Sequence, residues 1–166
     1  MMSMSRPVTR RATAQDRGRL SPCVCNTLRM VTRAVTQLYD ESLRPSGLRV
    51  TQFSVLAALA RRGEANVKQL TDALAIDQTT LTRSLTVLER DGLIERAPHP
   101  DGRIKAMRLT PAGVRALAVA RPLWGQAQQR VIGRWGPRAW AESQRRLARL
   151  LHVAVERRRR RPRRAS

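Results

Sequence analysis

The sequence predicts a mainly α-helical fold with one small β-hairpin. Hydrophobic residues make up 42% of the 166 residues, whereas aromatic residues make up only 3%, so the core must consist mostly of Leu, Val and Ala. Apolar residues recur at helical spacing over most of the chain. Only two short runs, 93–97 and 105–109, resemble strands. These observations favour helices packed on helices around one ordinary core.

The first two helices are predicted from their start and stop signals. Ser21 is a suitable N-cap and Pro22 a suitable first helical residue, and the apolar pattern that follows stops near Pro45. Thr51 is expected to cap a second helix that ends at Gly63.

A tight pair of helices comes next. Asn66 is expected to cap a short helix over 67–75, and Asp77 to cap a helix that runs to Arg90 and closes at Asp91-Gly92. Two short helices joined by a three-residue turn form a helix-turn-helix.

The two strand candidates flank Asp101-Gly102, which is a hairpin signal. A hairpin placed directly after a helix-turn-helix is a wing, and Asp101 is expected to hold its shape by capping the turn or pairing with an Arg. Thr110-Pro111 begins a long helix to about 133. A last amphipathic helix follows Gly136-Pro137.

The net charge of +21 is unevenly distributed. Residues 1–19 carry +4 and residues 157–166 carry +7, so residues 20–156 retain +10. Such a surface attracts polyanions, above all nucleic acid. The alternative is a solvated basic surface that reflects Arg-rich codon usage.

Composition also argues against several other classes of protein. No apolar run approaches the roughly 18 residues that cross a bilayer, and no signal-type stretch follows the first charges, so a cytoplasmic location without membrane contact is expected. The two cysteines make neither a disulfide scaffold nor a four-ligand metal site, and His99 and His152 have no partner in sequence. We expect no metal, no cofactor and no enzymatic activity.

The helix over 77–90 separates its residues into two faces at about 100° per residue. Leu81, Leu85 and Leu88 form one narrow stripe. Hydroxyls and guanidiniums, which suit a major groove, occupy the opposite face; the alternative is an ordinary solvated face. We expect DNA contacts from Gln78, Thr79, Thr80, Thr82, Arg83, Thr86 and Arg90 on this helix, and from Arg103 and Lys105 on the wing.

Several motifs together resemble those of MarR-family regulators over roughly residues 22–155. They are Thr51-Gln52-Phe53, Asp77-Gln78-Thr79-Thr80-Leu81-Thr82-Arg83, Leu88-Glu89-Arg90-Asp91-Gly92-Leu93, Asp101-Gly102-Arg103 and Leu109-Thr110-Pro111-Ala112-Gly113. The resemblance implies a homodimeric, sequence-specific regulator of transcription that binds a near-palindromic double-stranded DNA operator. Most such proteins are repressors released by a small aromatic ligand or by oxidation of a cysteine.

The domain organisation follows from these motifs. We expect a disordered basic arm over 1–20, a single domain over 21–156 and a basic disordered tail over 157–166. Within the domain, the winged helix covers about 50–110, and dimerisation helices cover about 22–44 and 111–156. The long apolar stripes of the last two helices agree with pairing to a second subunit.

The resemblance places Cys25 at the position of a peroxide-sensing cysteine, with Tyr39 as one assisting tyrosine. The other expected tyrosine positions hold Arg29 and Gln52. Cys23 and Cys25 are expected in a first helical turn, where amide donors and the helix dipole stabilise a thiolate. They point about 200° apart on one helix, so any disulfide would join two subunits. The alternative is that both cysteines only pack beside the dimer interface.

A ligand pocket is the other candidate switch. Arg29, Arg33 and Tyr39 are candidates to bind a carboxylate or phenol, with Trp124 as one wall; the alternative is surface arginines and a packing tyrosine. Trp135 and Trp140 are expected at an interface or in the core.

Two other function classes remain open. A nonspecific or architectural nucleic-acid-binding protein would use the Arg-rich tails and show little sequence preference. A thiol-dependent enzyme would need a resolving Cys-X-X-Cys and a nearby general base, which the sequence lacks.

Overall fold

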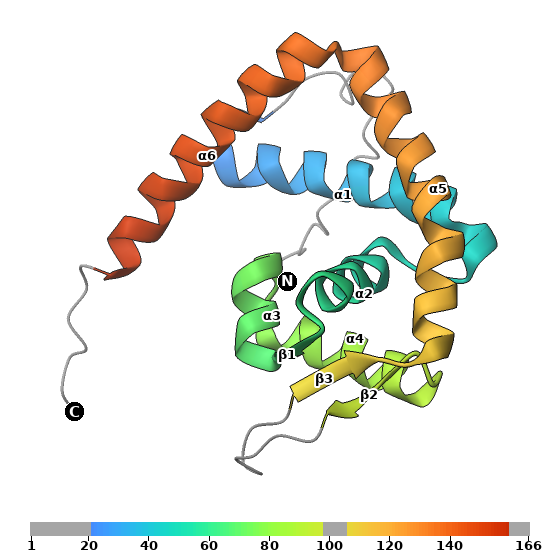
Figure 1. The fold of residues 1–166 in the computed structure, drawn as a ribbon. Helices are drawn as coiled ribbons and strands as arrows, with labels where there is room; N and C mark the ends of the chain where they lie inside the picture. Colours follow the sequence, from blue (N-terminus) through green and yellow to red (C-terminus); the bar gives the residue numbers. More distant parts are fainter. Residues whose placement is uncertain (1–20, 98–105, 160–166) are drawn as a thin grey trace, which may run out of the picture. The chain divides into compact units, whose positions relative to one another are not determined.

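The computed structural model describes residues 21–97 and 106–159, with side chains up to residue 154. The chain divides into two units, Met1–Gln37 and Leu38–Ser166, and the boundary falls inside the first helix. Figure 1 shows the elements in order: α1 (Val24–Leu43), the 3₁₀ turn η2 (Arg44–Ser46), α2 (Val50–Arg62), β1 (Glu64–Asn66), α3 (Val67–Leu74), α4 (Gln78–Arg90), β2 (Ile94–Ala97), β3 (Ala106–Leu109), α5 (Pro111–Trp135) and α6 (Pro137–Arg159).

The expected fold class, mainly helical with a small β-wing, is confirmed. β2 and β3 pair antiparallel, with Ala97 opposite Ala106 at the end nearest the wing loop. The sheet has a third strand that the sequence analysis missed, because β1 pairs with the other edge of β3 and places Ala65 opposite Met107. Three residues are too few to display strand alternation. None of the helices in the described residues combines the length and hydrophobicity that crossing a bilayer requires.

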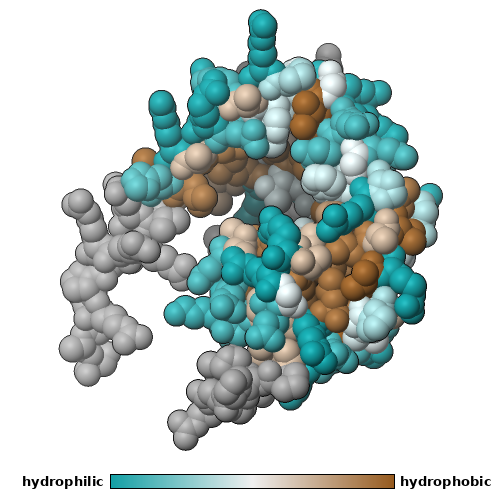
Figure 2. All heavy atoms as spheres, in the orientation of Figure 1, coloured by the Kyte–Doolittle hydropathy of each residue, from teal (hydrophilic) through white to brown (hydrophobic). Residues whose placement is uncertain are grey.

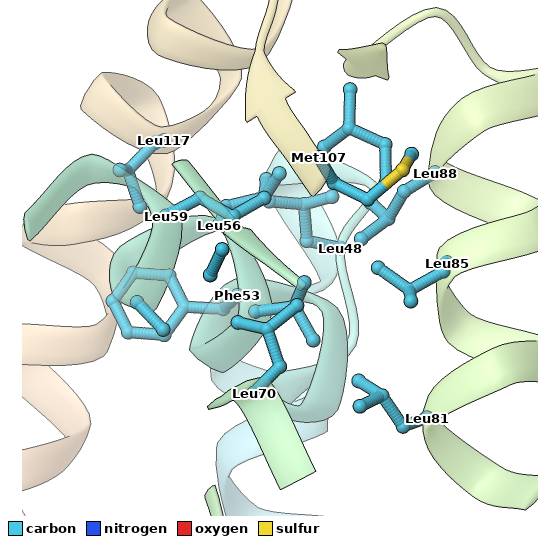
Figure 3. Packing of buried hydrophobic residues seen from close by; sticks show 14 of the residues in the cluster. Leu48, Phe53, Leu56, Leu59, Leu70, Leu81, Leu85, Leu88, Met107 and Leu117 are labelled. Atoms are coloured by element: carbon cyan, nitrogen blue, oxygen red, sulfur yellow. The ribbon is translucent and has the colours of Figure 1, made fainter. Parts of the chain in front are cut away.

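The core of the second unit is built almost entirely from aliphatic side chains. Figure 3 shows the leucines of α4 directed toward those of α2, with Met107 from the sheet and Leu117 from α5 beside them. Leu56 and Leu59 on α2 are completely buried. α2 therefore lies at the centre of this unit and supports α4, the sheet and α5.

Two helix starts differ from those expected. α1 begins at Val24, two residues late: the Ser21 hydroxyl accepts a hydrogen bond from the Cys23 amide at 3.2 Å, and the Cys23 carbonyl accepts the first helical hydrogen bond. Only Cys25 is thus in the first turn.

Thr51 as the cap of α2 is also wrong, because the helix begins at Val50. Its first amide donates to the Asp40 carboxylate at 2.8 Å, and the Gln52 side chain accepts from the Arg49 amide at 2.9 Å. Asp40 is ten residues upstream, so a local sequence pattern does not reveal it.

The remaining caps agree with the sequence. The Asn66 side chain caps α3 by accepting a hydrogen bond from the Gln69 backbone amide at 2.9 Å. The Gln69 side chain in turn accepts one from the Asn66 backbone amide at 2.8 Å. α3 ends at Leu74, one residue early, and Ala75 takes a left-handed conformation with φ of 52°. This conformation, unusual for a residue with a Cβ, turns the chain sharply toward α4. α6 extends to Arg159, so its last three residues belong to the Arg run.

A compact junction joins α4, the sheet and α5. The Thr110 hydroxyl donates to the Gly92 carbonyl at 2.6 Å and accepts from the Gly113 amide at 3.0 Å. The Thr110 amide donates to the Leu93 carbonyl at 3.1 Å. Gly113 lies so close that an added Cβ would be 1.9 Å from the Leu93 oxygen. The junction therefore requires glycine at position 113.

This contact generates a stability prediction. Gly113→Ala should lower the free energy of unfolding by about 1–3 kcal/mol, because the backbone of Leu93 must move to admit the methyl group. Gly133→Ala is the matched control in the same helix, since an added Cβ there meets nothing within 4 Å. It should raise stability by about 0.5–1 kcal/mol. Chemical denaturation measures both, and equal effects of the two variants would contradict the junction.

Candidate nucleic-acid interface

α4 has one buried face and one exposed face, as its sequence predicts. Leu81 and Leu88 are completely buried and Leu85 is 7% exposed. All the side chains expected to face outward are exposed: Thr79, Thr82, Arg83, Thr86 and Arg90. The geometry of the helix is thus confirmed, whereas its contacts with DNA stay a prediction.

The N-terminus of α4 is held by Asp77. Its carboxylate accepts the Thr80 amide at 2.9 Å and the Thr80 hydroxyl at 2.6 Å. These two bonds lower the pKa of Asp77, and the bond from the Thr80 hydroxyl has the larger effect. Thr80 is therefore occupied in closing the cap, while the side chains of Gln78 and Thr79 are exposed in the first turn.

The hydroxyls of Thr82 and Thr86 are turned back onto their own helix. Thr82 donates to the Gln78 carbonyl at 2.8 Å, and Thr86 donates to the Thr82 carbonyl at 3.0 Å. Each hydroxyl has one hydrogen to donate. In this structure neither has a hydrogen left for a ligand.

The exposed arginines near α4 differ in their partners. Arg90 is held by Asp91, with Nε 3.0 Å and a terminal nitrogen 2.9 Å from the same carboxylate oxygen. Within residues 21–97 and 106–159, Arg83 makes no ion pair or hydrogen bond, so its guanidinium has all its donors available for a ligand.

Two further arginines beside this surface were missed by sequence reasoning. Arg96 on β2 reaches Glu89 of α4 at 3.4 Å, and Arg108 on β3 pairs with Glu95 at 2.8 Å. Both are exposed. For Arg108 the alternation of β3 was the available signal, because it lies next to the buried Met107. Arg96 lies opposite Met107 in the ladder, so strand alternation does not predict its exposure. The expected wing residues Asp101, Arg103 and Lys105, and His99, lie outside the described residues.

The two cysteines are free and exposed. Cys23 lies immediately before α1 and Cys25 in its first turn, so the expectation that both thiols lie in the first turn is wrong for Cys23. Arg29 and Arg33 are exposed on the same part of α1, in the first unit.

The two other residues expected in a ligand pocket, Tyr39 and Trp124, lie in the second unit. Tyr39 is half-buried and donates to the side-chain oxygen of Gln128, and its burial raises the pKa of the phenol. Trp124 stacks on Phe53 with ring centroids 5.6 Å apart. It lines an open groove together with Phe53, Ser54, Ala57, Arg61, Leu74 and Arg121.

The remaining tryptophans pair with each other where α5 meets α6. Trp135 and Trp140 have ring centroids 5.5 Å apart, and Trp135 is 47% exposed. In the part of the chain that the structure describes, no three His, Cys, Asp or Glu side chains come together as metal ligands.

A helix-turn-helix whose second helix is exposed on one side, followed directly by a β-hairpin, defines a winged-helix protein. Comparison with known proteins agrees. The model of the MarR family matches residues 46–104. The multiple antibiotic resistance protein MarR of Salmonella typhimurium is 36% identical over 85 residues, which cover 51% of this chain and 59% of that protein.

Solved structures match over more of the chain. The transcriptional regulator MosR of M. tuberculosis, in complex with DNA, is 39% identical with a TM-score of 0.73, over 81% of this chain and 97% of that one. A MarR mutant from E. coli, in complex with operator DNA, is 28% identical with a TM-score of 0.68, over 75% of this chain and 90% of that one.

This chain belongs to the MarR family. The sequence match spans about half of the length of the curated relatives, 48% and 59% for the first two. IacR of Pseudomonas putida is named a transcriptional repressor and MosR a transcriptional regulator.

Proposed function

We propose that this protein is a sequence-specific DNA-binding regulator of transcription that inserts α4 into the major groove. The outward face of α4 carries the proposal, since it combines an unpaired guanidinium with a row of small hydroxyl side chains. The major groove admits one α-helix and presents acceptors on guanine that match the two-pronged donors of arginine. We assign this contact to Arg83.

The charge of the protein supports a nucleic-acid partner. Residues 20–156 carry a net charge of +10 without the two basic ends, so the folded part attracts phosphate by itself. MosR and the MarR mutant were each solved with DNA, and they share the fold of this chain. We assign phosphate contacts to the flanks of α4, including Gln78 and Thr79 in its first turn.

A homodimer that binds a near-palindromic operator is part of the proposal. Large apolar side chains of α6 are exposed in a single chain, among them Leu147, Leu150 and Leu151. α1 likewise exposes Leu28, Val31 and Val35. Figure 2 shows hydrophobic residues reaching the surface among hydrophilic ones. A second subunit is the natural cover for such stripes, and its two-fold axis would place two copies of α4 on two half-sites.

Arg83→Ala tests the assignment on α4. It should weaken binding to the preferred site by roughly 1–3 kcal/mol, because a two-pronged contact to a base edge is lost. Fluorescence anisotropy at fixed salt measures the loss. The thermal melting temperature should change little, since the side chain is exposed and has no partner among the described residues.

Arg115→Ala on α5 is the matched control, because it removes one exposed guanidinium outside α4. It should leave site preference intact. Equal losses in both variants, on specific and random duplex alike, would instead favour the nonspecific nucleic-acid-binding function.

We further propose that the protein is a repressor released by a change at α1 or in the Trp124 groove. For the thiol route, the exposed position of Cys25 in the first turn of α1 supports the proposal. An organic hydroperoxide would oxidise the Cys25 thiolate to a sulfenic acid and leave the corresponding alcohol, and a thiol of the partner subunit could then displace water to form a disulfide.

Hydroperoxide should therefore lower operator affinity of the wild type at least tenfold. Cys25→Ser should keep full affinity under the same treatment, while Cys23→Ser serves as the control that retains Cys25. Unchanged wild-type affinity after thiol oxidation has been verified by mass spectrometry would contradict the thiol route.

For the ligand route, the Trp124 groove supports an aromatic acid. It combines the Phe53 and Trp124 rings with the guanidinium-bearing residues Arg61 and Arg121, which suits a flat apolar body with a carboxylate.

Salicylate is a suitable probe for this route. In a Trp135→Phe/Trp140→Phe variant, which keeps Trp124 as the sole tryptophan, it should quench the emission saturably. Adding Arg121→Ala to this variant should raise the dissociation constant of salicylate about tenfold, because one charged hydrogen bond is lost. Quenching that never saturates would exclude this ligand site.

A further inference from the structure

We infer that Thr82 and Thr86 select thymine in the operator, by placing their methyl groups against thymine methyl groups in the major groove. This inference rests on the proposed DNA-binding function of α4. It concerns which bases the helix distinguishes, and it follows from the orientation of two hydroxyls.

The hydroxyl groups of Thr82 and Thr86 have no hydrogen left to donate. Both hydroxyl hydrogens are donated to carbonyls one turn earlier in α4, at 2.8 Å and 3.0 Å. Guanine offers only acceptors at its major-groove edge, N7 and O6. A hydroxyl without a free hydrogen cannot donate to them, so neither threonine favours guanine.

The same bonds determine where the methyl groups lie. A threonine in a helix has two common rotamers. The one observed here places the hydroxyl oxygen near the carbonyl of the residue four positions earlier. The methyl group then occupies another staggered position on Cβ. Both residues are exposed, so their side chains form part of the surface that α4 presents.

The two methyl groups form a pair of matched spacing. Residues four apart lie on one face of a helix, about 6 Å apart along its axis. Base pairs are stacked about 3.4 Å apart, so the pair spans about two base steps. Thymine is the base with a methyl group in the major groove, and contact between two methyl groups removes apolar surface from water.

The other polar residues of α4 differ in whether their side chains already have a partner. Thr80 is held by Asp77 and Arg90 by Asp91, so both are tied to the helix ends. Arg83 lies next to Thr82 in sequence and has no partner among the described residues. The preferred half-site should therefore contain a guanine for Arg83, with thymines within two base steps of it.

The experiment uses the full chain and a pool of random 30-base-pair duplexes. Repeated selection first yields a preferred site. Each thymine of that site is then replaced singly by uracil, which lacks only the methyl group, and affinity is measured at fixed salt. The wild type should lose about fourfold at one or two positions, the value expected for one buried methyl group.

Two matched variants identify the responsible side chain by the ratio of thymine to uracil affinity. Thr86→Ser keeps the hydroxyl but lacks the methyl group, so the ratio at one position should fall to about 1. Thr86→Val keeps a methyl group in place, so the ratio should persist whatever the overall affinity. The pair Thr82→Ser and Thr82→Val should act in the same way at a second position.

The outcomes separate this inference from the function on which it rests. A selected site with no uracil effect, or a ratio that survives in Thr86→Ser and vanishes in Thr86→Val, overturns the inference and leaves the regulator intact. If the pool yields no preferred site, the proposed function is wrong, and the inference that rests on it is wrong as well.

Discussion

The winged helix depends on a single contact, the close approach of Gly113 to the Leu93 carbonyl. Because no side chain intervenes at position 113, the first turn of α5 can lie directly against the chain that leaves α4. Thr110 then bridges the two through its hydroxyl, accepting from Gly113 and donating to Gly92. The end of α4, the start of β2, the end of β3 and the start of α5 thus meet at one point. α4 and α5 are therefore joined directly at this point.

The second constraint is the division of labour on α4. Its buried leucines attach it to α2, and its ends are closed by Asp77 and Asp91. Each acidic residue also occupies a neighbouring polar side chain, Thr80 or Arg90. The middle of the helix is left with Thr82, Arg83 and Thr86, and the Arg83 guanidinium has no partner among the described residues. Under the proposed function, base reading would be concentrated in about one helical turn, while both ends hold the helix in place.

Much of this arrangement was predictable, because the responsible patterns are local. The leucine spacing gave the buried face of α4, and Asn66 and Asp77 are caps whose partners lie three residues away. The failures involve distant partners. Asp40 caps α2 from ten residues upstream, and β1 exists only because β3 offers a free edge. Such contacts depend on the packing of whole helices, which the spacing of apolar residues does not encode.

The large positive charge explains attraction to DNA better than it explains choice among DNA sequences. Much of it lies at the two ends of the chain, and around α4 several arginines are paired with Asp or Glu: Arg90, Arg96 and Arg108. Paired guanidiniums still contribute to the field that draws in a duplex, but their donors are engaged. Under the proposed function, choice would fall to Arg83 and to the threonine methyl groups, whose contacts with base edges are short-ranged. Affinity and selectivity consequently reside in different residues, so salt should change the first far more than the second.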